Sequence, residues 1–182
     1  MKFQFKVNLS EQDYLDYNLF LYLRSHYGKN QMRTIRILIA IVCVLVITFF
    51  LLFGGLSGMS SVLFFVLSIA VMIFSQLFLD KSFAYGLKWQ IKDLKKRGKM
   101  AYSPKSLMEF YEDVFVETTP ENKNEQKYSS IERISLVDNK VFYIHISNLM
   151  AYMLPVSCFE SKEQFEAFLS FIKTKCEIVD TY

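Results

Sequence analysis

The sequence predicts an α+β protein: a two-helix transmembrane hairpin and a small antiparallel β domain with a C-terminal helix. Three observations support this fold class. Between Arg36 and Asp80 there is no Asp, Glu, Lys, Arg or His. After residue 100, short apolar runs alternate with turn signals, as is typical of antiparallel strands. A capping-box pattern then opens a last amphipathic segment near the C-terminus.

Residues 1–34 are expected to contribute one strand and one helix on the cytoplasmic side. Phe3, Phe5 and Val7 alternate with polar residues, which predicts a strand over Lys2–Asn8. A lone strand leaves its backbone groups unpaired, so we expect it to join the edge of a C-terminal sheet within 107–154, with the three apolar side chains in the core. The hairpin would then be inserted into one split domain. The alternative is a free arm that adds to a partner protein's sheet.

The helix of this first region has recognisable start and stop signals. Ser10 and Asp13 have the spacing of a capping box, so a helix is expected to begin there. It is expected to run to about Tyr27, with Gly28 as its C-terminal stop. Asn30 is then the expected cap of the next helix.

Residues 35–79 predict two membrane-spanning helices, Ile35–Phe53 and Ser60–Leu79, joined by a glycine-rich turn at 54–58. About 20 helical residues cross a hydrocarbon core of about 30 Å. A hairpin in a soluble core would show a polar face, which these segments lack. Positive residues flank both outer ends and are absent from the turn, so both termini are expected in the cytoplasm and the chain in the cell membrane. The flanking cations are Lys29, Arg33, Arg36, Lys81, Lys88, Lys92, Lys95, Lys96, Arg97 and Lys99.

Small side chains on the second span predict close helix packing. Ser61, Ser68 and Ser75 recur every seven residues and therefore share one face. The small counterparts on the first span are Ala40, Cys43 and Thr48. Packing of the hairpin on itself is the leading interpretation, followed by a homo-oligomer and by a substrate or ion path, although no ionisable group lies at membrane depth.

Residues 80–100 predict a basic juxtamembrane helix that continues the second span to a stop at Gly98. Phe83, Leu87, Ile91 and Leu94 form one apolar stripe. The helix either lies on the lipid surface or packs its stripe on the soluble domain. In the first case it contacts anionic lipid headgroups. The residues assigned to headgroup binding are Lys88, Lys92, Lys95, Lys96 and Arg97.

Residues 101–182 predict a cytoplasmic β domain. Ser161 and Gln164 form a capping box that opens the last helix. A polar loop is expected at 121–125, and turn residues at 138–140 separate two longer strands. The expected strands are Leu107–Phe110, Val114–Val116, Tyr128–Val137, Val141–Ser147 and Leu149–Leu154, the last ended by Pro155.

The chain resembles the bacterial YcxB-like family of small membrane proteins. The resemblance rests on Phe5, Val7, Ser10, Asp13 and Tyr14, then on Tyr128-x-x-Ile131-x-x-Ile134, Tyr143-Ile144-x-Ile146, Leu154-Pro155-x-x-x-Phe159 and Phe165-x-x-Phe168-Leu169. It implies a membrane hairpin that carries a β domain of pleckstrin-homology-like type. It implies no catalytic residue, and a fold alone assigns no function.

Residues with catalytic or ligand chemistry are sparse, so no enzyme, cofactor or metal is expected. Two His and three Cys show no metal-ligand spacing, and no phosphate- or dinucleotide-binding motif is present. His145 is expected on the solvent face of its strand, opposite Ile144 and Ile146. A nucleophilic pair of Cys158 with His145 is a minor alternative. The basic stretch lies beside a membrane span, so nucleic acid is not expected as a partner.

Two function classes remain. The first is a non-enzymatic, membrane-anchored interaction module whose cytoplasmic domain binds a protein, a peptide or a lipid headgroup. The second is a small transporter-associated or immunity-type component that acts through its spans on another membrane protein or a membrane-active peptide. The expected partners are the bilayer, anionic headgroups and an unidentified membrane or cytoplasmic protein.

Overall fold

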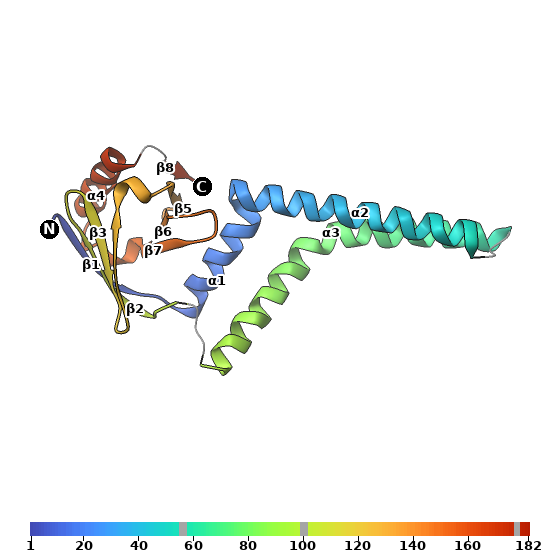
Figure 1. Cartoon of the computed structure of the whole chain (residues 1–182), viewed down its shortest axis with the longest axis horizontal. Helices are drawn as coiled ribbons and strands as arrows, with labels where there is room; N and C mark the ends of the chain where they lie inside the picture. The colour runs from blue at the N-terminus through green and yellow to red at the C-terminus, as the bar shows by residue number, and fades with distance from the viewer. Residues whose placement is uncertain (55–57, 99–101, 177–178) are drawn as a thin grey trace. The chain divides into compact units, whose positions relative to one another are not determined.

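The structure is a computed structural model that describes residues 1–54, 58–98, 102–176 and 179–182 (Figure 1). The chain divides into two compact units. Residues 1–17 and 99–182 form the first, which we call the β domain, and residues 18–98 form the second, which we call the helical unit. Antiparallel sheets and two long apolar helices confirm the α+β class.

The first sheet of the β domain joins the segments that precede and follow the helical unit. Its strand order is β1-β2-β3-β4, and all neighbouring pairs are antiparallel. In β1, Phe3 faces Phe110 of β2. Phe5 and Val7 are each only 1% exposed. The N-terminal strand therefore joins the sheet edge, as expected, and is not a free arm. The strands are β1 (Phe3–Asn8), β2 (Lys105–Phe110), β3 (Val114–Thr118) and β4 (Lys123–Lys127).

The second sheet has the order β7-β6-β5-β8. The pairs β5–β6 and β6–β7 are antiparallel, whereas β8 runs parallel to β5. Strand β8 is not predicted from the sequence, and β4 lies where a polar loop is expected. Both are short strands, and β4 is strongly polar, so neither shows an apolar alternation. The strands are β5 (Arg133–Val137), β6 (Val141–His145), β7 (Ala151–Pro155) and β8 (Val179–Thr181).

Helix α4 (Lys162–Lys175) closes the core between the two sheets (Figure 1). Its N-cap is Ser161, whose hydroxyl accepts from the Gln164 N–H at 3.2 Å. Phe168 is fully buried, and its ring lies 4.9 Å from that of Phe110 and 5.5 Å from that of Phe142. Such edge-on aromatic contacts add to the free energy gained from burial, so this ring packs α4 against both sheets.

The link from the β domain to the first long helix differs from the expected single helix. The capping box is present, since Asp13 accepts from the Ser10 N–H at 2.8 Å. However, α1 (Glu11–Leu19) is followed by a π-helical turn (Phe20–Arg24), and Ser25 rather than Asn30 caps the next helix. Gly28 lies inside that helix and is not a stop. A β-carbon there would collide with the backbone of residues 21 and 22, so the close approach requires glycine.

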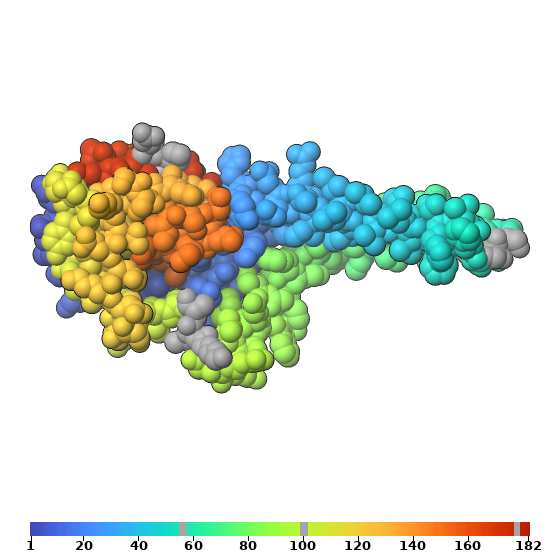
Figure 2. Space-filling view, viewed as in Figure 1, coloured from blue at the N-terminus to red at the C-terminus, as the bar shows by residue number. Residues whose placement is uncertain are grey.

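Helices α2 (His26–Phe53) and α3 (Met59–Lys96) lie along each other over their apolar halves, after which α3 bends away (Figures 1 and 2). The mean hydropathy of their most apolar windows is 3.1 and 2.6, so both are long and apolar enough to cross a membrane. Large side chains cover their surfaces, for example Phe53 at 74% exposed. The expected glycine turn lies partly outside the described residues, and α3 runs without a break into the basic segment.

Candidate functional site

A groove in the β domain encloses about 440 Å³ between the β6–β7 turn, α1 and the segment before β2. Tyr14 of α1 stacks on Tyr102, with ring centroids 4.7 Å apart. The Tyr17 hydroxyl donates to the Leu149 carbonyl at 3.2 Å and so holds the β6–β7 turn against α1. The lining residues are Leu9, Tyr14, Tyr17, Tyr102, Ser103, Glu117, Asn124, Ile146, Leu149, Met150, Ala151, Tyr152 and Met153.

Among the described residues that line this groove, Glu117 is the one that carries a carboxylate. Strand alternation places it on the same face of β3 as Phe115, which is fully buried in the core. Burial raises the pKa of the Glu117 carboxyl, and a hydrogen bond with Ser106 opposes that shift. A carboxylate with lost hydration attracts a positive partner more strongly than a solvated one does.

The rim of the groove carries exposed apolar side chains. Leu149 and Met150 are 51% and 61% exposed. Tyrosine and methionine are enriched at protein interfaces, where they combine large contact areas with adaptable shape. The groove is therefore suited to a peptide-like partner that carries both apolar and basic groups.

Strand β7 lies at the edge of the second sheet, beside the groove, among the described strands. The Ile146 N–H donates to the Met150 carbonyl at 3.0 Å. Because hydrogen-bonded positions alternate along an antiparallel pair, Ala151 and Met153 direct their backbone groups away from β6. Among the described strands, β7 pairs only with β6. An added strand therefore has backbone partners at two groove-lining residues.

His145 is buried, which corrects the solvent-facing position expected for it. The second sheet is covered on both faces at β6, where Tyr143 packs against Tyr17 with ring centroids 5.0 Å apart. His145 Nε2 lies 3.2 Å from the Ser135 hydroxyl. Burial, with the charge of Arg133, lowers the histidine pKa to about 4. Burial also raises the pKa of the Cys158 thiol, so neither group has the protonation properties of a nucleophilic pair at neutral pH.

The residues assigned to helix packing lie on the half-buried side of α3. Ser68 donates to the Phe64 carbonyl at 2.8 Å and Ser75 to the Met72 carbonyl at 2.7 Å, so both hydroxyls are satisfied within their own helix. Ser61 is also half-buried. On α2, Ala40 and Cys43 are half-buried, but Thr48 is exposed and does not belong to this face.

The residues assigned to lipid headgroups occupy the exposed face of the second half of α3. Helical spacing places Tyr85 and Trp89, each 65% exposed, on that face. In the apolar stripe, Ile91 is 7% exposed, and the centroid of the half-buried Phe83 ring lies 5.1 Å from that of Tyr22. Leu87 and Leu94 are also half-buried. The exposed cations are Lys88, Lys92, Lys95, Lys96 and Arg97.

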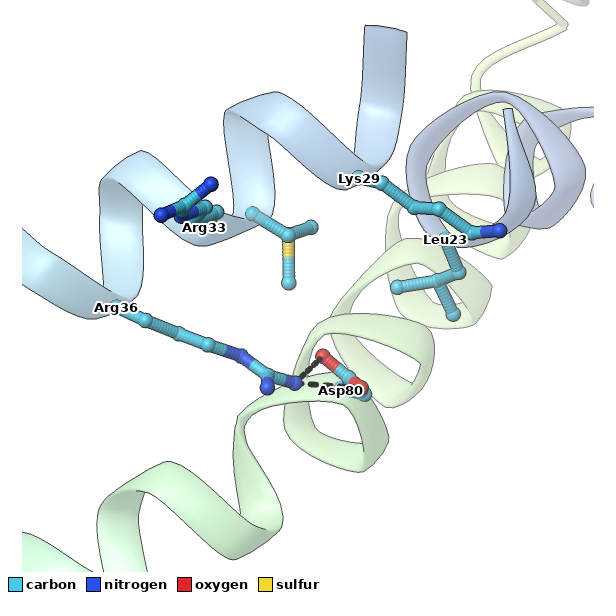
Figure 3. A pocket seen from close by; sticks show the side chains of 6 residues that line it. Leu23, Lys29, Arg33, Arg36 and Asp80 are labelled. Carbon is cyan, nitrogen blue, oxygen red and sulfur yellow. Dashed lines mark hydrogen bonds and ion pairs between the residues drawn. The ribbon is translucent and has the colours of Figure 1, made fainter. Parts of the chain in front are cut away.

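A second cavity, of about 220 Å³, lies in the helical unit (Figure 3). Arg36 of α2 reaches Asp80 of α3, where its Nη2 donates to both carboxylate oxygens, at 2.8 and 2.7 Å. The Gln76 side-chain amide also donates to the Arg36 carbonyl at 3.2 Å. Arg36 is predicted from the sequence only as a flanking charge, whereas in the structure its ion pair joins the two helices where their apolar runs end.

In the described part of the chain, no three His, Cys, Asp or Glu side chains are placed so that they could hold a metal ion.

Glu117 was not predicted as a site residue from the sequence. The signal was present, because alternation along β3 places this acidic residue on the face of Phe115.

Comparison with known proteins identifies one family. The model of the family described as YcxB-like protein matches residues 110–172, from the last residue of β2 into α4. No curated protein and no solved structure matches the chain significantly. Across this part of the β domain, the chain is thus similar to the YcxB-like family, and the resemblance noted from the sequence is confirmed.

Proposed function

We propose that this chain is a non-enzymatic, membrane-anchored interaction module whose β domain binds a basic segment of a partner protein. The observation that carries the proposal is the Glu117 carboxylate in a groove lined by tyrosines. Two sheets closed by α4 also support the assignment of a pleckstrin-homology-like fold to this domain.

The groove has the chemistry to receive a Lys or Arg side chain. The cation would pair with Glu117, while the faces of the neighbouring tyrosine rings attract positive charge. A neutral or acidic side chain would leave the partly dehydrated carboxylate without a counter-charge, which is costly. The partner's backbone would add to the edge of β7 at Ala151 and Met153. The exposed Leu149 and Met150 would cover the apolar side chains of the bound segment.

Anchoring in the cell membrane by α2 and α3 completes the proposal. The pairing of β1 with β2 supports two crossings, because the strands before and after the apolar helices must lie on the same side of the membrane. The cations at both outer ends favour the cytoplasm as that side.

A selection from a randomised peptide library tests the binding proposal, with the full chain purified in mild detergent. The enriched peptides are expected to contain Lys or Arg, and Glu117→Gln should weaken their binding about tenfold or more. The matched control is Glu125→Gln, which removes an exposed carboxylate from β4 and should leave binding unchanged. Enrichment without basic residues, or equal binding by Glu117→Gln, would contradict the proposal.

An exchange of the two apolar spans distinguishes the binding proposal from the alternative, in which the protein acts through these spans. Residues 37–53 and 60–79 are replaced with unrelated apolar spans of the same length, which leaves the β domain unchanged. Under our proposal the exchanged protein still captures the enriched peptides at the membrane. Loss of the cellular phenotype with peptide binding retained would assign the role to the spans.

A further inference from the structure

The cavity beside the Arg36–Asp80 pair lies where the apolar part of the helical unit ends (Figure 3). Arg36 directly precedes the uncharged run and Asp80 directly follows it. In a membrane, such positions are at the depth of the lipid phosphates rather than of the acyl chains. The cavity is lined by Leu23, Lys29, Met32, Arg33, Arg36 and Asp80.

The lining carries more positive than negative charge. Lys29, Arg33 and Arg36 contribute three cations, against the single carboxylate of Asp80. These cations follow each other at intervals of four and three residues, so they lie on one side of α2. The remaining lining is apolar and includes Met32, which is 5% exposed. The cavity thus combines an excess of two positive charges with apolar walls at Leu23 and Met32.

Arg36 retains an unused donor next to this cavity. Its Nη2 is engaged by Asp80, but its Nε is buried without a hydrogen-bond partner. A buried donor without an acceptor is unfavourable, and a guanidinium donor of this kind fits an oxyanion well. Phosphate oxygens would satisfy the Nε while Lys29 and Arg33 neutralise the charge.

We propose that this cavity binds the phosphate group of an anionic phospholipid. The site is separate from the groove in the β domain and from the exposed lysines of α3. Its position at the end of both apolar runs favours a lipid as the source of the phosphate over a soluble anion. Arginine is suited to the task because its planar donors match phosphate geometry.

Native mass spectrometry of the full chain in a non-ionic detergent tests the proposal, with phosphatidylglycerol as the probe. The double variant Lys29→Gln/Arg33→Gln leaves the Arg36–Asp80 pair intact. It should bind the lipid about 25-fold more weakly, from about fivefold for each positive charge near a lipid surface. The matched control Lys123→Gln/Lys127→Gln removes the same charge from exposed positions of β4 and should change the affinity much less.

Two further measurements complete the test. The helix content of both double variants, from circular dichroism, should equal that of the unchanged chain, so that a loss of binding is not a loss of fold. Inorganic phosphate is titrated against the bound lipid. Competition at low millimolar phosphate would overturn the lipid as the ligand, and an equal loss of binding in both double variants would overturn the cavity as the site.

Discussion

Protonation of His145 should destabilise the β domain in mild acid. The folded-state pKa is lowered from 6.5 to about 4 because the ring is buried near Arg133. Between these values the unfolded chain binds a proton that the folded chain does not, so stability falls as the pH is lowered through this window. At pH 5, about 1.5 pH units below the ordinary value, the loss is about 2 kcal/mol relative to pH 8, at about 1.4 kcal/mol per unit.

The assay is urea unfolding of the full chain in detergent at pH 8 and at pH 5. The fraction of unfolded β domain is measured by its susceptibility to a protease. His145→Asn removes the titration, and it should lose about 2 kcal/mol less on acidification than the unchanged chain does. His26→Gln changes the exposed histidine and serves as the control. Because the carboxyl groups are the same in both proteins, the difference between their losses of stability on acidification reports on His145. An identical acid loss in His145→Asn and the unchanged chain would refute the reasoning.

Four further predictions follow from the structure. Phe5→Ala should destabilise the β domain by about 3–5 kcal/mol in the same unfolding assay, because it opens a cavity in the core. Gly28→Ala should lower the thermal midpoint of the helical unit, since its β-carbon meets backbone atoms. A cysteine introduced at Ser57 should react with an impermeant thiol reagent in intact cells, and one at the exposed Lys127 should not; the reverse pattern would refute the topology. Glu117→Gln should stabilise the β domain at pH 7, because burial raises the folded-state pKa and the charged carboxyl is unfavourable there; an unfolding midpoint below that of the unchanged chain would contradict this.

Periodicity predicted the elements that bury one face. The alternation of Phe3, Phe5 and Val7 identified β1, and the uncharged run from residue 37 to 79 identified the apolar parts of α2 and α3. The capping boxes at Ser10 and Ser161 were predicted because their hydrogen bonds connect residues only three apart. Local signals of this kind need no knowledge of the tertiary structure.

The misassigned residues depend on contacts from outside their own segment. His145 alternates with apolar neighbours, which predicts a half-exposed strand, but α1 covers the second face of that sheet through Tyr17. Gly28 follows a helix-like stretch, as a C-terminal stop would, yet it is required by a close approach to the preceding turn. The Arg36–Asp80 pair joins residues 44 positions apart, and such a pairing follows from tertiary structure alone.

The pairing of β1 with β2 connects the folding of the β domain to the insertion of the helices. Phe3 faces Phe110 across the sheet, so the whole helical unit is synthesised between the two strands. A chain that crossed the membrane only once would place these strands on opposite sides, and the core would lack Phe5 and Val7. Losing that much buried apolar surface costs several kcal/mol, which is comparable to the total stability of a small domain. Under the proposed topology, a folded β domain and its binding groove therefore form on chains that have inserted both apolar helices and not on chains that have inserted only one.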